Sequence, residues 1–255
     1  MAFRFAYLGS GSRGNAALIE VDNTCVMLDC GFAIKETERR LARLHREPAD
    51  ISAVLITHEH GDHVAGAVRF TRKHKIPLYM TPGTRAAVRD AERAPLREVN
   101  CHEAFVVGDL YVQPTPVPHD AREPCQYVFT DGESRLGVLT DTGHVSLHML
   151  QHYSACDALA LECNHATAML AAGPYPRSLK ERVGGAFGHL NNDQSAQMLN
   201  DIDCSRLRQV VAVHISETNN TTAQARGALA GALSCADDDI AVVDQDDGLG
   251  WRDVG

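Results

Sequence analysis

A short run of residues rich in metal-binding side chains stands near the end of the first quarter of the chain. Residues 57–63 read THEHGDH, which places His58, His60, Asp62 and His63 within six positions after an apolar segment. Imidazole and carboxylate groups bind zinc and related divalent ions, and a short loop after a strand lets several of them converge. A polar turn capped by Asp62 is the alternative, but a cap requires one polar residue rather than four. The run therefore predicts a metal site.

The spacing of this run resembles the signature of the metallo-β-lactamase superfamily, and further segments match in the same order. Residues 26–31 (VMLDCG) resemble its first motif, in which Asp29 would support the metal loop from behind. Three later side chains follow apolar segments and resemble the remaining ligands, namely His119, Asp141 and His214. A lone histidine after an apolar strand is as often an ordinary core or surface residue, so the inference depends on the order of the whole set.

The resemblance implies two divalent ions that share one bridging carboxylate, which would be that of Asp141. The other ligands would divide into one set of His58, His60 and His119 and a second set of Asp62, His63 and His214. Such nitrogen-rich ligation accepts Zn, Mn, Fe or Ni, and affinity order alone does not identify the metal. We expect zinc or manganese, and we expect Asp62 to be catalytic as well as a ligand.

The elements that must position these residues alternate between strands and helices. Apolar runs separated by turn residues predict strands over 3–8, 16–21, 25–28, 53–56, 76–80, 105–107, 110–115, 126–130, 135–140, 158–161 and 210–213. Helical spacing and capping signals predict helices over 34–44, 64–74, 82–91, 147–153, 166–171 and 192–200. This order favours an α/β fold, an αββα four-layer sandwich of two mixed β-sheets with outer helices.

The length of the chain is compatible with one compact unit. At 255 residues it exceeds the usual single-domain length, yet α/β sandwiches of this size often form one domain. By the resemblance, the interval between Asp141 and His214 is too short for a large cap insertion of the β-CASP type found in RNase J proteins. We therefore expect residues 1–255 to form a single metallo-β-lactamase-like hydrolase domain with an open site.

Composition excludes some classes of protein and favours others. Thirteen histidines are many for this length, which is consistent with metal chemistry. The net charge of −9 opposes a broad basic surface for nucleic acid, although bound divalent ions would still attract a phosphate locally. Eight scattered cysteines without a CxxC motif predict mostly buried thiols.

The sequence also bears on location and assembly. No apolar run approaches the ~18 residues that suggest a membrane span, and the first residues lead directly into a strand pattern without the regions of a signal peptide. We therefore expect a cytoplasmic protein with no membrane partner. The sequence leaves the oligomeric state open, a homodimer included.

Within the superfamily, several blocks resemble the YycJ (WalJ) branch of bacterial DNA exonucleases, which lies near the RNase Z and RNase J nucleases. The blocks that carry this resemblance are residues 8–15, 119–124, 161–165, 175–182, 188–192 and 214–220. They extend over nearly the whole chain and are more specific than the metal loop alone. The chain departs from the branch at Ala166, where an acidic residue is expected, and at Asn191, where serine is common.

The resemblance also implies roles for residues around the metals. His189 would protonate the leaving oxygen or hold the phosphate. The alternative for residues 188–192 is the cap of the helix that follows, and the two roles are compatible. Glu162 and His165 would form a supporting pair behind the ligands or a phosphate contact. Local hydrogen bonding within a loop is the alternative for His165.

Candidate substrate contacts come from three flanking segments. Arg177, Lys180 and Arg182 could follow a nucleic-acid backbone, although a basic run on a short helix is more often a solvated face. The glycine-rich loop and the segment after the last ligand could line the site through Arg13, Asn15, Asn219 and Asn220.

These features lead to three hypotheses for function. The first is a metal-dependent nuclease whose substrate is DNA, a 5′ exonuclease by the resemblance. The second is another hydrolase on the same scaffold, acting on a small phosphodiester, a thioester or a lactone, or an RNase Z-like enzyme that processes RNA. The third is a non-catalytic regulatory protein, which would be expected to lack ligands that this chain retains.

Overall fold

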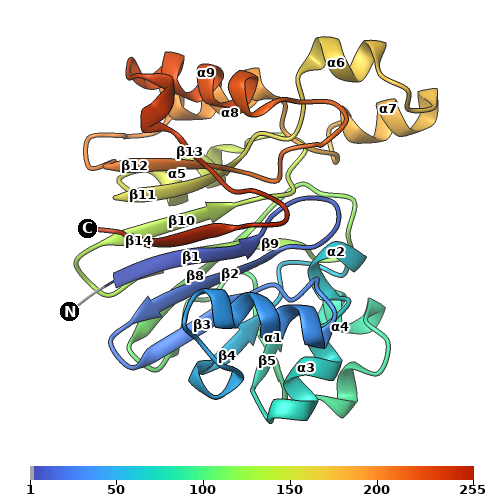
Figure 1. Ribbon diagram of the computed structural model, residues 1–255, viewed down its shortest axis with the longest axis vertical. Coiled ribbons are helices and arrows are strands. Elements are labelled where there is room, and N and C mark those ends of the chain that lie inside the picture. Colours follow the sequence, from blue (N-terminus) through green and yellow to red (C-terminus); the bar gives the residue numbers. More distant parts are fainter. Residues whose placement is uncertain (1–2) are drawn as a thin grey trace.

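The computed structural model describes residues 3–255 of the chain. Within these residues the strands form two mixed sheets of seven strands each, and helices cover the outer face of both sheets (Figure 1). The expected αββα four-layer architecture is thereby confirmed. The expectation that residues 1–255 form a single domain without a cap insertion stays a prediction.

The first sheet contains the first six strands of the chain and the last one. Its order is β14-β1-β2-β3-β4-β5-β6, antiparallel from β14 to β3 and parallel from β3 to β6. The strands are β1 (Phe3–Gly9), β2 (Ala16–Val21), β3 (Thr24–Leu28), β4 (Ala53–Leu55), β5 (Leu78–Met80), β6 (Leu96–Glu98) and β14 (Leu249–Asp253).

The second sheet repeats this arrangement. Its order is β13-β12-β11-β10-β9-β8-β7, antiparallel from β7 to β10 and parallel from β10 to β13. The strands are β7 (Phe105–Val107), β8 (Leu110–Pro116), β9 (Cys125–Thr130), β10 (Arg135–Leu139), β11 (Ala158–Glu162), β12 (Gln209–Val213) and β13 (Ala241–Val242).

The helices form the two outer layers. Those nearest the first sheet are α1 (Ile34–Arg43), α2 (Gly61–Val64), α3 (Ala67–His74) and α4 (Pro82–Ala87), with the short 3₁₀ turns η1 (Pro48–Asp50) and η2 (Ala91–Arg93). The remaining ones are α5 (Leu147–Tyr153), α6 (Thr167–Ala172), α7 (Arg177–Val183), α8 (Asn192–Asp201), α9 (Thr222–Leu233) and the turn η3 (Asp237–Asp239). In Figure 1, α6 and α7 project beyond the end of the second sheet.

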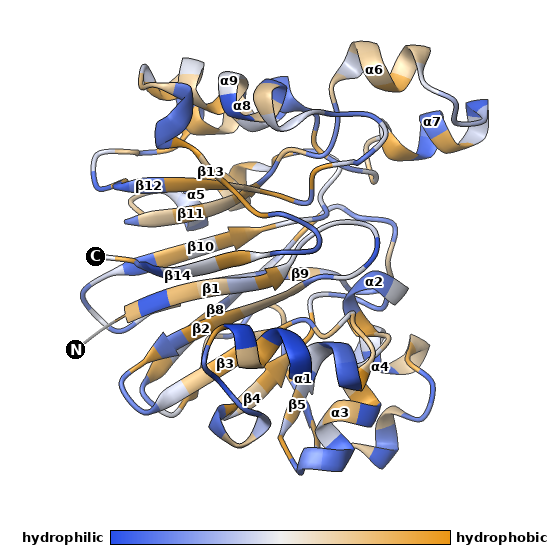
Figure 2. Ribbon diagram, in the orientation of Figure 1, coloured by the Kyte–Doolittle hydropathy of each residue, from blue (hydrophilic) through white to orange (hydrophobic). Residues whose placement is uncertain are grey.

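Three apolar clusters hold the layers together. One lies between the two sheets and includes Phe5 and Tyr127, and the other two lie between each sheet and its helices. Strands covered on both faces need apolar residues on both, which explains the nearly continuous hydrophobic runs (Figure 2). Removal of this apolar surface from water drives the assembly of the layers and fixes the strand ends that position the site.

The structure corrects the expected helix over 64–74, which is divided into α2 and α3. The Gly66 N–H donates to the Cys30 carbonyl at 2.9 Å, and a Cβ at Gly66 would lie 2.0 Å from the Phe32 carbonyl oxygen. This close approach of the 30–32 segment separates the two helices. Asp62 and His63 consequently lie inside α2 rather than before a helix.

Other elements differ from the sequence-based expectation in extent or were not indicated by it. The helix expected over 82–91 ends at Ala87, because Val88 returns to an extended conformation. The sequence patterns do not indicate β6, β13 or β14. These strands are short or half-exposed, so they lack a clear apolar run, and β14 acquires its partner only through pairing with β1.

Two general features complete the description. In the part of the chain that the structure describes, no helix combines the length and the apolar character needed to cross a membrane. The eight cysteines are free thiols and six of them are buried, as expected from their scattered positions.

Candidate metal centre

Segments far apart in the sequence meet at one edge of the two sheets. Strands β3 and β4 run parallel in the first sheet, and β8, β10, β11 and β12 share one direction in the second. Because strands that share a direction end at the same edge, residues that follow them are brought together. These residues are Asp29 after β3, His58 after β4, His119 after β8, Asp141 after β10 and His214 after β12.

The structure brings together the first expected set, His58, His60 and His119. Each offers one ring nitrogen, and the three nitrogens lie within 4.8 Å of one another. Nδ1 of His119 donates to the Gly188 carbonyl at 2.9 Å, which leaves Nε2 directed toward Nδ1 of His60 at 3.2 Å. The group behind each ring thus selects the nitrogen that faces the centre.

The second expected set, Asp62, His63 and His214, also converges within 4.8 Å. Oδ2 of Asp62 lies 3.4 Å from Nε2 of His63 and 3.6 Å from Nε2 of His214. Nδ1 of His63 donates to Oδ2 of Asp29 at 2.7 Å, so this imidazole also presents Nε2 to the centre.

Asp141 lies between the two sets. Its Oδ2 is 3.1 Å from Nε2 of His63, and its Oδ1 is 3.9 Å from Nε2 of His119. Asp141 also belongs to the group formed with His58 and His63. This position between both sets is what a bridging carboxylate requires.

Three residues at this edge have a strained backbone conformation. Asp29, Asp141 and His214 adopt positive φ values of 60°, 52° and 53°. Residues other than glycine rarely occupy this left-handed region, which costs on the order of 1–3 kcal/mol and persists where surrounding contacts enforce it. The sharp turn after each strand redirects the side chain into the centre.

The donor set fits divalent metal ions. Nε2 of His58 and Nε2 of His214 are buried, and neither has a hydrogen-bond partner within residues 3–255. A buried polar atom without a partner is costly unless another group satisfies it. The arrangement of these two nitrogens among the other imidazole and carboxylate donors matches the ligands that zinc and manganese accept.

Electrostatics around the centre reflect the crowding of charges. Burial would raise the pKa of Asp141, but the positive charges of His214 and His63 hold it well below its ordinary value. Burial would lower the pKa of His63, but Asp141 and Asp29 raise it well above its ordinary value. Burial, together with the neighbouring His63, lowers the pKa of His58. The histidines around Asp141 therefore favour its ionised form, whereas burial raises the pKa of Asp29 behind His63.

Asp29 supports the loop as the resemblance implied. Its carboxylate accepts from the Thr57 backbone N–H at 2.9 Å and from the Thr57 hydroxyl at 3.0 Å, as well as from His63. Next to it, a Cβ at Gly31 would lie 1.8 Å from the Asp62 carbonyl oxygen. Only glycine allows the two segments to pack this closely.

Glu162 holds His189 rather than His165. Nδ1 of His189 donates to Oε1 of Glu162 at 2.8 Å, and Nδ1 of His214 lies 3.2 Å from the same oxygen. Burial would raise the pKa of Glu162, but His189 and the other donors lower it to about 2. Burial would lower the pKa of His189, but Glu162 and then Asp141 raise it.

His165 corrects part of the sequence-based expectation. Among the described residues, no hydrogen bond joins it to Glu162, and its buried Nδ1 has no partner. Its backbone forms an isolated bridge to Asn191 instead. The expected pair with Glu162 is therefore not formed in the structure. The described residues give the His165 ring no local hydrogen bond either, and its expected contact with a phosphate stays a prediction.

Three expected substrate contacts are buried and have structural roles. The Asn15 amide lies 3.3 Å from Oδ2 of Asp62 and 3.1 Å from Nε2 of His63, so it contacts two donor atoms of the second set directly. The Asn220 side chain exchanges hydrogen bonds with Asn192 at 2.8 and 2.9 Å. Asn219 is fully buried beneath α6, with its Oδ1 close to Gly173. Their expected contact with a substrate stays a prediction.

The expected basic contacts are mostly engaged elsewhere. Arg13 pairs with Glu217 and Asp246, and the Arg177 side chain pairs with Glu181 on its own helix. The Lys180 ammonium donates to the Ala171 carbonyl at 2.6 Å. These three side chains are therefore engaged by other groups in the structure, and their expected contact with a substrate stays a prediction.

Arg182 reaches the rim of the centre through Asp120, a residue to which the sequence assigns no role. Its Nε donates to Asp120 at 2.5 Å, and Asp120 in turn lies 3.6 Å from Nε2 of His60 and 3.5 Å from Nε2 of His119. The sequence feature that could have indicated a role for Asp120 is its position directly after His119. The sequence analysis also assigned no role to Phe187, which stands two residues before His189 and is 59% exposed in the structure.

Comparison with known proteins identifies the architecture. Residues 24–215 match the model of the Beta-lactamase superfamily domain, a stretch that includes every proposed ligand. The chain belongs to the metallo-β-lactamase superfamily. It is a hydrolase of that fold, and the fold together with the histidine and aspartate clusters implies divalent metal ions.

Individual relatives confirm the resemblance to the YycJ and WalJ branch. The chain is 31% identical to exodeoxyribonuclease YycJ of Bacillus anthracis over 234 residues, which covers 89% of this chain and 87% of that protein. It is 31% identical to exodeoxyribonuclease WalJ of Streptococcus pneumoniae over 245 residues, 93% of this chain and 90% of that one. The metallo-β-lactamase fold protein YhfI from Bacillus subtilis has a TM-score of 0.77 and 14% identity, and the match covers 99% of this chain and 100% of that one.

Proposed function

We propose that this hydrolase is a nuclease that degrades DNA from the 5′ end. The observation that carries the proposal is the Glu162–His189 pair, which adds a positioned proton donor to a donor set suited to two metals. Relatives named exodeoxyribonucleases, which match about nine-tenths of the chain, support the same substrate class.

The donor sets would hold two divalent ions, zinc or manganese. Bound there, such ions supply activation of a water molecule and stabilisation of negative charge on the phosphate oxygens. Asp62 is the proposed ligand with the most direct access to solvent among the carboxylates, since its side chain is 24% exposed and that of Asp141 is 1% exposed. The Asp62 carboxylate would therefore accept a hydrogen bond from the attacking water and orient it.

His189 would deliver the proton that the leaving oxygen needs. Its Nδ1 is held by Glu162, and its ring lies 5.3 Å from that of His119 and 5.2 Å from that of His214, measured between centroids. The side chain is 19% exposed, so the ring sits between the proposed ligands and solvent. An imidazole fixed through one nitrogen can present the other to a phosphodiester oxygen.

An exposed aromatic ring near His189 favours a nucleic-acid substrate over a small ester. The Phe187 ring is exposed and forms a T-shaped pair with the ring of His144, at 6.4 Å between centroids. The Phe187 carbonyl accepts from the Asp120 N–H at 3.0 Å, which fixes the segment at the rim. Exposed aromatic side chains of this kind stack on nucleobases.

The test uses the purified chain with Mn or Zn and several substrates in parallel. These are single- and double-stranded DNA labelled at either end, RNA, and a small chromogenic phosphodiester. We expect time-dependent release of 5′ nucleotides from DNA, which disappears in Asp62→Ala and His63→Ala. His102→Ala is the matched control, because His102 is exposed and belongs to none of the donor sets.

The outcomes separate the competing functions. Hydrolysis of the small phosphodiester without any attack on nucleic acid would contradict the nuclease assignment and favour a small-molecule hydrolase. Cleavage of RNA in preference to DNA would instead favour an RNA-processing enzyme. Release of nucleotides from the 3′ end would overturn the proposed polarity.

A further inference from the structure

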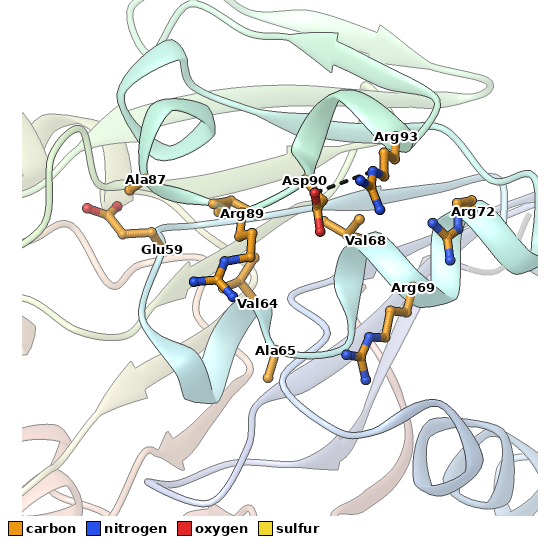
Figure 3. Close-up of a pocket in the computed structure, with 11 residues that line it drawn as sticks. Glu59, Val64, Ala65, Val68, Arg69, Arg72, Ala87, Arg89, Asp90 and Arg93 are labelled. Carbon is orange, nitrogen blue, oxygen red and sulfur yellow. Dashed lines mark ion pairs between the residues drawn. The ribbon is translucent and has the colours of Figure 1, made fainter.

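A concave surface of about 500 Å³ lies directly beside the metal loop (Figure 3). One wall is α3, and the other is the segment over 87–93 that contains η2. Four arginines line it, two from each wall, namely Arg69, Arg72, Arg89 and Arg93. We call this surface the arginine groove.

The charge of the arginine groove is largely uncompensated. All four arginines are exposed. Within residues 3–255, no ion pair joins Arg69, Arg72 or Arg89 to a carboxylate, and Arg93 alone pairs with Asp90, at 3.3 Å. Three unpaired guanidinium groups in one groove are notable in a chain with a net charge of −9. The four arginines outnumber the two carboxylates that also line the groove, those of Glu59 and Asp90, and this local excess of positive charge attracts a polyanion.

The arginine groove borders the loop that carries four of the proposed ligands. Glu59, which stands between His58 and His60, closes one end of it, and Val64 directly follows His63. Oε1 of Glu59 accepts from the Arg122 backbone N–H at 2.8 Å, which holds this side chain in place. The metal loop therefore has the donor sets on one side and the groove on the other.

We propose that the arginine groove binds the phosphate backbone of the nucleic-acid strand whose end is cleaved at the metal centre. The inference rests on the proposed nuclease function and deepens it by placing the part of the strand that is not cleaved. Guanidinium groups match phosphate oxygens in pairs, and Arg69 and Arg72 lie on the same face of α3 because they are three residues apart.

This placement differs from the one that the sequence suggested. The basic residues of α7 are engaged by Glu181, Asp120 and a backbone carbonyl, whereas most of the groove arginines are free. The groove is also far larger than a single phosphate ion needs. An extended strand that contributes several phosphates uses both walls at once.

The test measures binding separately from cleavage. The metal-loaded chain is titrated with a fluorescent single-stranded phosphorothioate oligonucleotide, whose linkages resist hydrolysis, at several salt concentrations. Each lost phosphate contact removes about 0.7 from the slope of log K against log salt for a single strand. Arg69→Ala/Arg72→Ala should therefore lower the slope by about 1.4 and weaken binding about 25-fold near 0.1 M salt.

Two further variants make the result specific. Arg89→Ala/Arg93→Ala, from the opposite wall, should show a similar loss of affinity and of salt slope. Agreement between the two variants would exclude a folding defect in α3 as the cause. Arg208→Ala/Arg252→Ala removes the same charge from exposed positions, and Arg208 precedes β12 at the end opposite His214. This control should bind like the unaltered protein.

The outcomes also distinguish this inference from the proposed function. If the unaltered protein degrades DNA but both groove variants bind with unchanged slope, the groove proposal is overturned and the nuclease assignment stands. If the unaltered protein neither binds nor cleaves DNA, both fall. Displacement of the oligonucleotide by inorganic phosphate at an equal concentration of phosphate groups would show a site for the free ion and overturn strand binding.

Discussion

At the scale of single residues, hydrogen bonds to one ring nitrogen set the orientation of three histidines in this site. Asp29 orients His63, the Gly188 carbonyl orients His119, and Glu162 orients His189. A partner on one ring nitrogen selects the tautomer and aims the other nitrogen. The chemistry of the centre therefore depends on buried residues that would never touch a substrate.

His189→Ala should retain both metals and lose most turnover on DNA. The expected loss is about 10²- to 10⁴-fold in kcat, the usual contribution of a positioned general acid. A phosphodiester with a nitrophenolate leaving group should lose much less, because that group departs without a proton. Metal content by elemental analysis and kcat on both substrates provide the measurement.

Two results would contradict this role for His189. Loss of bound metal in His189→Ala would identify a ligand or a structural residue. Equal losses on DNA and on the nitrophenyl ester would show that the ring acts by holding the phosphate rather than by giving a proton.

At the scale of elements, the site depends on how closely the strand-end segments approach one another. The Asn15 N–H donates to the Asp62 carbonyl at 2.7 Å, and the Cys30 N–H donates to the His63 carbonyl at 2.8 Å. These bonds attach α2 to the turns after β1 and β3. The short helix that holds two proposed ligands is thus fixed by its neighbours rather than by its own length.

Gly31→Ala should destabilise the protein and loosen the metal centre. The added methyl would lie 1.8 Å from the Asp62 carbonyl oxygen, and a backbone atom cannot move aside cheaply. Overpacking of this kind costs about 1–3 kcal/mol in the free energy of unfolding. Urea denaturation with and without metal would measure both effects.

A second glycine provides the control for this prediction. Gly231 lies in α9, and nothing lies within 4 Å of a Cβ built there. Gly231→Ala should leave metal binding unchanged and should stabilise the helix by up to about 1 kcal/mol. If Gly31→Ala were as stable as the unaltered chain, the close approach would not be the reason for glycine at that position.

At the scale of the whole molecule, the two sheets act as one frame for the centre. The last strand, β14, returns to pair with β1, and the Val254 N–H donates to the Phe3 carbonyl at 2.8 Å. Both sheets contribute side chains to the shared core. The ligands on opposite sheets therefore keep their separation only while the whole sandwich is folded.

Removal of metal should lower the stability of the entire protein. A metal present at about 100 times its Kd stabilises the folded state by about 2.7 kcal/mol. At this chain length, a change of about 1 kcal/mol in the free energy of unfolding shifts Tm by about 2–4 °C. Excess chelator should thus lower Tm by roughly 5–10 °C in a thermal melt. In Asp141→Ala the chelator should have little effect, and an unchanged Tm of the unaltered protein would argue against metals at this centre.

The sequence alone was enough to indicate the layers and the candidate ligands. Apolar runs reveal strands because strands covered on both faces must be apolar along their length. His58, His60, Asp62 and His63 lie on one loop, so their convergence is a local property of the chain. The remaining candidates could be placed because each follows a strand.

Tertiary structure decided what surrounds the candidate ligands. It showed that Glu162 contacts His189 rather than His165, that Asp120 connects Arg182 to the rim, and that Asn219 is buried. It also showed which arginines are free, since the basic run on α7 is engaged and the arginine groove is not. These properties depend on contacts between residues distant in the chain, and neither residue type nor local spacing records which partner a side chain meets.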